Sequence, residues 1–207
     1  FLARFNYNYK QRYYVTVTGR YDGASNFAAN NKWAFFPSAA VKWNLANENF
    51  LKDCRWIDDL SIRMSAGLTG NDAISTYRSL AVLSSTTGGY LFDGSQPVAF
   101  YRSRLDSPDL TWEKTAAYNV AIDWSMFKGR LNITAEAYKS KTTDLLMSLA
   151  VAAQTGYTSR WTNICSTSNK GIELSIESQN IVRPNFHWTT TLTMSHNDQM
   201  VDDIGSE

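Results

Sequence analysis

Apolar and polar residues alternate with a period of two along eight separate segments of this chain. In the segment 13–21, Val15 and Val17 fall on one side and Thr16 and Arg20 on the other, because successive side chains of a strand point to opposite faces. The eight segments are residues 1–9, 13–21, 36–44, 60–68, 114–126, 131–139, 171–179 and 186–195. The alternation predicts an all-β chain whose strands each have one apolar and one polar face.

The lengths of the connections distinguish between two kinds of sheet. In a soluble sheet the apolar face meets a core, whereas in an outer-membrane barrel it meets lipid and the polar face lines a wet lumen. Shorter connections (10–12, 45–59, 127–130 and 180–185) alternate here with longer ones (22–35, 69–113 and 141–170). Bacterial barrels have short periplasmic turns and long extracellular loops, and aromatic residues near the strand ends suit their interfacial girdles. We therefore expect an antiparallel up-and-down transmembrane β-barrel segment.

Composition excludes several functional classes. The chain has 20 basic and 19 acidic residues, a balance that gives no electrostatic reason to expect nucleic acid as a partner. No apolar run approaches the length of a membrane helix. Two cysteines and two histidines lack metal-ligand spacing, and no nucleophile motif or phosphate loop is present. We expect no catalytic site, no metal and no cofactor.

Two sets of residues are candidates for functional contacts. Aromatic side chains in the long connections could stack on sugar rings, pack against a partner protein or pack loop on loop; they are Trp33, Phe35, Tyr90, Phe92, Tyr101, Tyr157 and Trp161. Charged residues on the polar strand faces are expected to line the lumen; they are Arg20, Arg63, Asp123, Glu136 and Glu173. A wet lumen accepts such a mixed-sign set, whereas isolated charges in a soluble core would be costly.

Three short polar motifs mark the places where strands meet long connections. They read DGASNF at 22–27, TGND at 69–72 and DLTWE at 109–113. Asp, Asn, Ser and Gly satisfy backbone groups and form tight turns where strand pairing ends. We favour this structural role for the motifs over direct ligand contact.

Several stretches, in order and with matching spacing, resemble the SusC/RagA-like TonB-dependent outer-membrane transporters. They are RYYVTVTGRYDGASNF, KWAFFPSAAVKWNLANENF, SIRMSAGLTGN, SPDLTWEKTAAYNVAIDW, EAYKSKTTDLL and TSNKGIELSIES, and the resemblance runs over residues 1–200. It implies a location in the bacterial outer membrane, among its lipids, and a plugged barrel of about 22 strands. It also implies a SusD-like surface lipoprotein as a lid, and coupling to TonB through an N-terminal region that this chain lacks. The implied substrates are oligosaccharides, or peptides in some members.

The chain opens inside a strand-like segment without a signal peptide, so we expect it to be an internal piece of a larger protein. Residues 1–207 would then all belong to one barrel domain, with the plug and the remaining strands elsewhere. Two alternatives stay open: a complete small structural barrel, and a soluble β-rich carbohydrate-binding domain or hydrolase. For a hydrolase, Glu173 and Glu177 would lie about 13 Å apart along one strand, which is too far for either glycosidase mechanism.

The two cysteines are expected at opposite ends of the sheet. Cys54 lies in the connection 45–59 and Cys165 in the connection 141–170. The apolar band of a spanning barrel is about 25 Å tall, whereas a disulfide requires Cα atoms within about 7 Å. We predict that the two thiols do not bond to each other.

Overall fold

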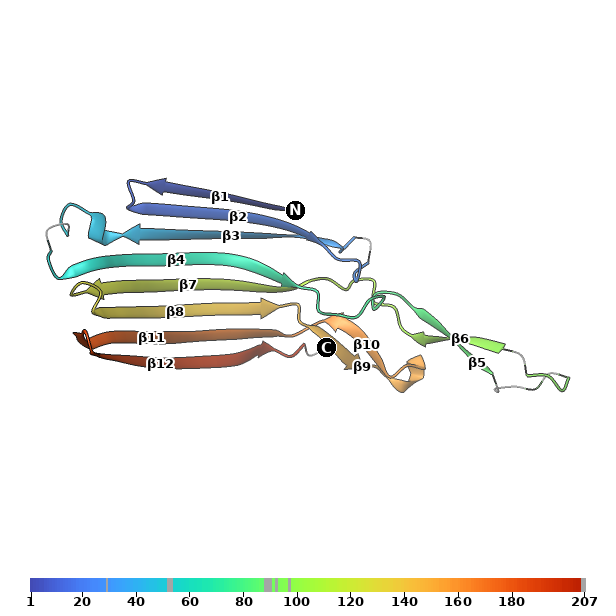
Figure 1. Cartoon of the computed structure of the whole chain (residues 1–207). Helices are drawn as coiled ribbons and strands as arrows, with labels where there is room; N and C mark the ends of the chain where they lie inside the picture. Colours follow the sequence, from blue (N-terminus) through green and yellow to red (C-terminus); the bar gives the residue numbers. More distant parts are fainter. Residues whose placement is uncertain (29, 52–53, 88–90, 92, 97, 206–207) are drawn as a thin grey trace.

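The computed structural model describes residues 1–28, 30–51, 54–87, 91, 93–96 and 98–205 (Figure 1). Its main feature is an eight-stranded antiparallel sheet with the order β1-β2-β3-β4-β7-β8-β11-β12. These strands are β1 (Leu2–Tyr9), β2 (Tyr13–Gly23), β3 (Trp33–Asn44), β4 (Ile57–Asn71), β7 (Glu113–Met126), β8 (Leu131–Thr143), β11 (Ser166–Arg183) and β12 (Phe186–Asp203). Each predicted segment corresponds to one of them, and the predicted antiparallel β class is confirmed.

The register of the sheet sorts side chains by face, as the alternation predicts. Cross-strand partners point to the same side of a sheet. One row of successive partners runs through Val41, Met64, Val120, Ala137 and Ile172. The adjacent row, on the opposite face, runs through Lys42, Arg63, Ala121, Glu136 and Glu173. The sheet is therefore apolar on one face and charged on the other.

Several strands are longer than the sequence pattern predicts. β3 begins at Trp33, so Trp33 and Phe35 are strand residues and not loop residues. β12 continues to Asp203 through a charged stretch that lacks apolar alternation. Backbone pairing does not require an apolar face, and hydrogen bonding between the strands continues beyond the point where the alternation ends.

Two of the long connections contain hairpins of their own. β5 (Val82–Thr87) pairs with β6 (Val98–Arg104), and β9 (Leu146–Ala150) pairs with β10 (Ser159–Asn163). Both hairpins lie at the same end of the sheet, opposite the short turns (Figure 1). A short 3₁₀ turn at Leu45–Asn47 follows β3, where the Asn44 side chain accepts a hydrogen bond from the Ala46 amide.

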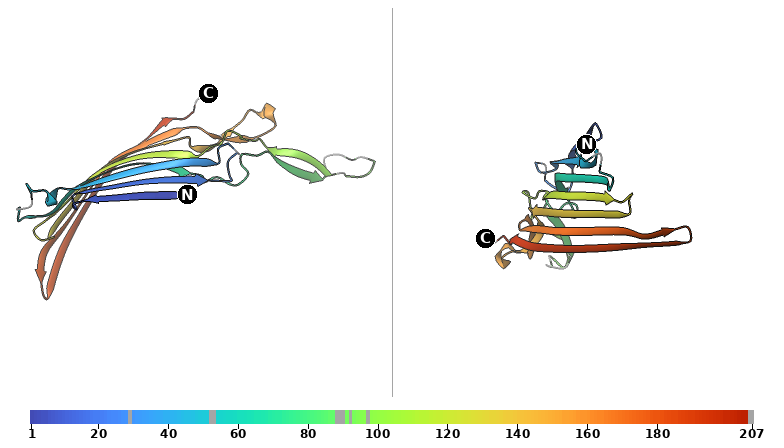
Figure 2. Two further views of the ribbon diagram at one scale, coloured as in Figure 1. Left: turned by 90° about the horizontal axis from the view of Figure 1, so that it is seen from above. Right: turned by 90° about the vertical axis from the view of Figure 1, so that its left-hand side faces the viewer.

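The sheet is a single curved layer, and the β5–β6 hairpin projects beyond it (Figure 2). No second layer of described residues covers either face, so large apolar side chains such as Phe5, Met64 and Ile172 are more than half exposed. The described helical segments are two three-residue 3₁₀ turns, Leu45–Asn47 and Ala153–Thr155, and none has the length and apolar character to cross a membrane. The main buried cluster lies at the end of the sheet that carries the long connections.

Candidate functional site: the loop end and the polar face

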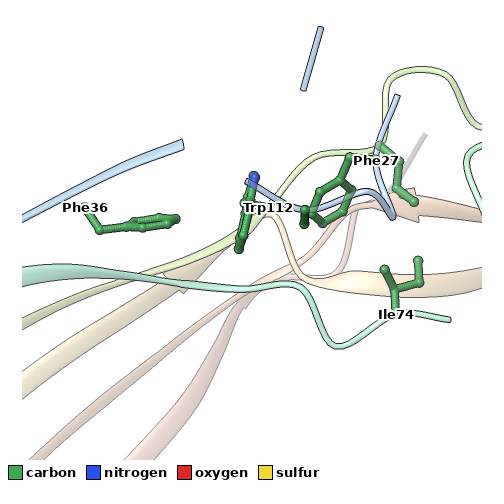
Figure 3. Close-up of a cluster of buried hydrophobic side chains, with 6 residues drawn as sticks. Phe27, Phe36, Ile74 and Trp112 are labelled. Carbon is green, nitrogen blue, oxygen red and sulfur yellow. The ribbon is translucent and has the colours of Figure 1, made fainter. Parts of the chain in front are cut away.

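Three long connections meet around a small buried core at one end of the sheet (Figure 3). The Trp112 ring lies between Phe27 and Phe36, with centroids 5.3 Å and 5.4 Å away. Ile74 belongs to the same cluster. These four side chains come from the connection after β2, from β3, from the connection after β4 and from the segment before β7. Burying their apolar area holds the loops against one another.

Hydrogen bonds made by the polar motifs reinforce this core, which we call the loop core. Asn26 donates to the carbonyl of Asp72, 3.2 Å away, and thereby joins the first motif to the second. The indole N–H of Trp112 donates to the carbonyl of Lys32, 3.3 Å away. The Asn31 amide donates to the carbonyl of Leu110, 3.3 Å away. These contacts agree with a structural role for the three motifs.

Asn163 attaches the third long connection to the loop core. Its side-chain oxygen accepts a hydrogen bond from the Thr111 amide, and its NH₂ donates to the carbonyls of Thr111 and Asp144, each at 2.8 Å. Glu113 acts nearby, where it accepts from Asn71 and from the Leu146 amide. Glu113 is the last residue of the DLTWE motif, whereas Asn163 belongs to no recognisable spacing in the sequence.

The candidate aromatic residues divide into buried and exposed groups. Trp161 packs against the loop core, and the Arg78 guanidinium lies 5.6 Å above its ring. Trp33 stacks on Tyr21 with 5.1 Å between centroids and is nevertheless 54% exposed. Phe35 and Tyr101 are 57% and 51% exposed. Tyr157 is half-buried, while Tyr90 and Phe92 lie outside the described residues. Contact of the exposed group with substrate or partner stays a prediction.

The polar face carries the charged candidates. Arg63 and Asp123 form a bidentate ion pair across β4 and β7, with N–O distances of 2.6 Å and 3.1 Å, and Thr134 donates to the same carboxylate. Glu136 and Glu173 are direct cross-strand partners, so two carboxylates face each other on β8 and β11. Lys42, Arg63 and Glu136 line a hollow of about 280 Å³. Arg20 pairs with Asp22 at 2.6 Å and lies over the Phe36 ring, which links this face to the loop core.

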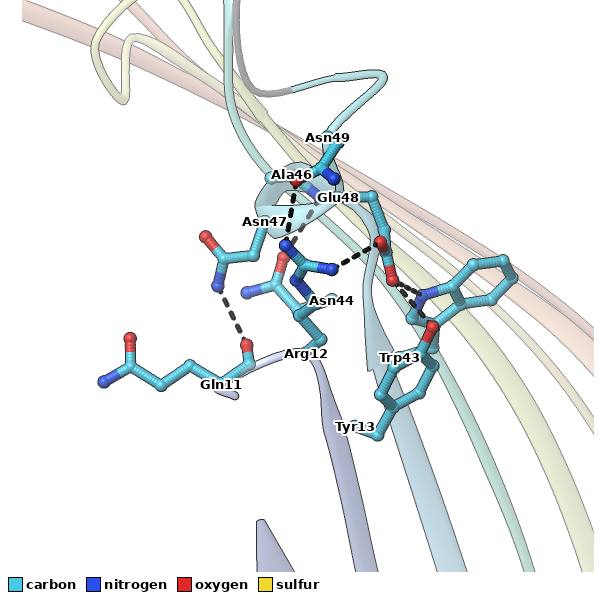
Figure 4. A network of polar contacts seen from close by, with 9 residues as sticks. All are labelled: Gln11, Arg12, Tyr13, Trp43, Asn44, Ala46, Asn47, Glu48 and Asn49. Atoms are coloured by element: carbon cyan, nitrogen blue, oxygen red, sulfur yellow. Dashed lines mark hydrogen bonds and ion pairs between the residues drawn. The ribbon is translucent and has the colours of Figure 1, made fainter. Parts of the chain in front are cut away.

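At the opposite end of the sheet, Glu48 joins two connections (Figure 4). Its carboxylate accepts from the Tyr13 hydroxyl at 2.7 Å, the Trp43 indole at 3.2 Å and the Arg12 guanidinium at 3.1 Å. These donors, with the Tyr13 hydroxyl foremost, hold the pKa of the Glu48 carboxyl below its ordinary value. Arg12 also donates to Asn49, so the β1–β2 turn is fixed to the β3–β4 connection.

The side chains of the described residues that could ligate a metal ion are dispersed. Within the described ranges, no group of three or more His, Cys, Asp or Glu side chains is arranged to hold a metal ion. Cys54 and Cys165 carry free thiols. Cys54 lies beside the short-turn end and Cys165 between β10 and β11, at the loop end. The charged polar face and the exposed aromatic rings at the loop end are accessible to solvent.

Comparison with known proteins identifies where such sheets occur. The family model described as "TonB dependent receptor-like, beta-barrel" matches residues 1–205. The chain is 38% identical over 207 residues to TonB-dependent receptor P26 of Formosa agariphila, across 99% of this chain and 20% of that protein. It is 35% identical over 204 residues to TonB-dependent receptor SusC of Bacteroides thetaiotaomicron, across 96% of this chain and 20% of that protein.

A solved structure, the RagAB peptide importer in its closed-closed state, contains the same arrangement of strands. It matches with a TM-score of 0.90 at 27% identity, over 99% of this chain and 22% of that chain. The present chain thus spans about a fifth of the length of the relatives that it matches.

Proposed function

This chain belongs to the TonB-dependent receptor-like β-barrel family of the bacterial outer membrane, and we propose that it forms part of the wall of an active importer. The proposed cargo is an oligosaccharide, with peptides as the alternative class. The resemblance to the SusC/RagA-like transporters motivates the oligosaccharide class, and the description of one solved structure as a peptide importer motivates the alternative. The energy would come through TonB, which would contact a region outside this chain.

The two-faced sheet is the observation that carries this proposal. The face with Val41, Met64 and Ile172 suits lipid, because charged side chains on a lipid face are destabilising. The face with Arg63 and Glu136 suits a wet lumen. On this assignment, the lumen-lining set is Arg20, Arg63, Asp123, Glu136 and Glu173. The Arg63–Asp123 pair is partly exposed, at 44% and 28% of each side chain, and is accessible to a plug or a passing solute.

The loop end would face outward and meet a SusD-like lipoprotein and the substrate. Its packed core fixes the positions of the loops, while Trp33, Phe35 and Tyr101 remain exposed. Rigid aromatic surfaces offer a large contact area at a low cost in conformational entropy. We propose that the exposed rings contact substrate or lid, and that the partly buried Trp161 acts by holding their support in place.

Uptake assays in the native organism would test the proposal. Cells that lack the gene are complemented with the wild type, Trp33→Ala or Trp124→Ala, and are fed labelled oligosaccharides and labelled oligopeptides separately. Wild type is expected to restore TonB-dependent uptake of one class. Trp33→Ala is expected to reduce that uptake several-fold, and Trp124→Ala, a tryptophan near the opposite end of the sheet, to leave it near wild type. Uptake that is independent of TonB, or the reverse order of the two variants, would contradict the proposal.

A further inference from the structure

An apolar groove lies along β8 on the face assigned to lipid. Its floor is Ala135 and Ala137, which are small and exposed. Val120 and Ile122 of β7 form one wall, and Ile172, Leu174 and Met194 of β11 and β12 form the other. The groove has a volume of about 540 Å³, within the range of about 300–1,000 Å³ that is typical of ligand sites. Two alanines between larger neighbours therefore create a trough where most of this face is covered by bulky side chains.

A lysine cluster lies immediately above this groove, toward the loop end. Lys139 follows Ala137 by two residues on β8, so both point to the same side of the sheet. Lys139 and Lys170 are direct cross-strand partners. Lys141 is the next residue of β8 on the same face, one step closer to the loop end. A hollow of about 460 Å³ is lined by these three lysines together with Asp198 and Asp202. On β8 the apolar surface therefore changes to a basic surface between Ala137 and Lys139.

The cluster retains capacity for an additional anion. Lys170 pairs with Asp198 at 3.2 Å and Lys141 with Asp202 at 3.7 Å, and the lysine side chains of both pairs remain more than half exposed. Exposed ion pairs of this kind contribute little stability, so another anion can compete for their lysines. Lys139 forms no ion pair with any described residue. Three lysines against two carboxylates leave the hollow with a net positive charge.

We propose that the groove and the lysine cluster together bind one phosphorylated membrane lipid. An acyl chain would lie over Ala135 and Ala137, and a phosphate of the headgroup would bind at Lys139, Lys170 and Lys141. Both halves of such a lipid are matched, because the apolar trough continues the lipid-facing surface and the cations lie where that surface ends. A free phosphate ion would use only the cluster, and a neutral lipid only the groove. The inference concerns the outer surface of the sheet and is independent of the transported solute.

Native mass spectrometry of the protein purified from outer membranes would test this site. The probes are a phosphorylated disaccharide-based lipid, the same lipid after enzymatic dephosphorylation, and inorganic phosphate alone. The phosphorylated lipid is expected to remain bound, and dephosphorylation to weaken its retention at least about ten-fold. Lys139→Gln is expected to weaken it about five-fold, the equivalent of about 1 kcal/mol for one lysine near a membrane surface. Lys139→Gln/Lys170→Gln should weaken it further.

Two matched controls separate the site from general effects. Lys128→Gln removes an exposed lysine from the turn at the opposite end of β8 and is expected to leave lipid retention unchanged. Ala137→Phe fills the groove and is expected to reduce retention, whereas Ala39→Phe, an exposed position on the same face of β3, is not. Equal retention of both lipid forms, or equal effects of Lys139→Gln and Lys128→Gln, would overturn the proposal. Binding of inorganic phosphate without the lipid would overturn it as well.

Discussion

Replacing Gly70 with alanine is expected to destabilise the loop end by about 1–3 kcal/mol, the usual cost of overpacking a core. A Cβ at this position would meet the Phe36 ring, with Cε1 and Cε2 only 2.5 Å and 2.8 Å away and Cζ closer still. These separations are shorter than van der Waals contact, so the ring or the strand must move. Phe36 is 3% exposed and packs on Trp112, so a displaced ring has no free space in the loop core.

A double-mutant cycle tests whether Phe36 is the cause. Phe36→Ala alone should cost about 3–5 kcal/mol, as for other buried phenylalanines. Adding Gly70→Ala to Phe36→Ala should cost almost nothing, because the clashing ring is gone, which gives a coupling energy of about 1–3 kcal/mol. The free energy of unfolding is measured by denaturant titration in detergent micelles, followed by tryptophan fluorescence.

Gly19→Ala is the matched control for this cycle. It also introduces a Cβ beside an aromatic ring, but the nearest atoms of Phe35 are 3.2 Å away and that side chain is exposed. Its expected cost is below about 0.5 kcal/mol, as for most surface substitutions. If Gly70→Ala destabilises the protein equally with and without the Phe36 ring, the steric explanation is wrong.

Three further predictions concern other parts of the chain. Because the pKa of Glu48 is lowered in the folded state, its contribution to stability is present above the ordinary carboxyl pKa and is lost as pH falls through the folded value; Glu48→Gln should flatten the acid side of a stability–pH profile. Asn163→Ala leaves the Thr111 backbone without two of its partners, and should cost about 1–3 kcal/mol and increase protease cleavage within 144–163. Cys54 and Cys165 should give no linked peptide in a non-reduced digest, even after oxidation, because they lie at opposite ends of the sheet.

Period-two alternation was sufficient to locate the eight long strands, because each has one face that must be apolar. It could not reveal β5, whose sequence VLSSTT carries little alternation. Nor could it show that β3 begins at Trp33, since the first four residues of that strand read WAFF and do not alternate. The soluble alternative was removed only by the family match, because a half-apolar strand reads the same against a protein core or against lipid.

The loop core depends on contacts that no local pattern encodes. Phe27 and Trp112 are far apart in sequence and meet only because β2, β3, β4 and β7 are neighbours in the sheet. The polar face shows the intermediate case. Alternation placed Arg63 and Asp123 on the same side, but only the side-chain positions show that these diagonal neighbours form an ion pair.

The continuous register across the sheet also determines how steeply the strands cross the membrane. Tyr13, at the short-turn end of β2, is in register through the intervening strands with Met194 of β12. Two aromatic residues, Phe186 and Trp188, lie at the same end of β12. Trp188 is six residues before Met194, and six strand-to-strand steps separate β2 from β12. β7 lies halfway between β2 and β12, and its residue in the row from Tyr13 to Met194 is Ile122. Trp124 lies two residues from Ile122, toward the short-turn end of β7.

If these aromatic side chains mark one membrane–water interface, that interface shifts by about one residue per strand, toward the short turns, relative to the rows of cross-strand partners. A rise of about 3.3 Å per residue and a spacing of about 4.8 Å between strands then give a tilt of about 35° from the membrane normal. This value falls within the range of about 35–45° for outer-membrane barrels. The diagonal course of the aromatic residues therefore records the shear of the closed barrel within this one curved sheet.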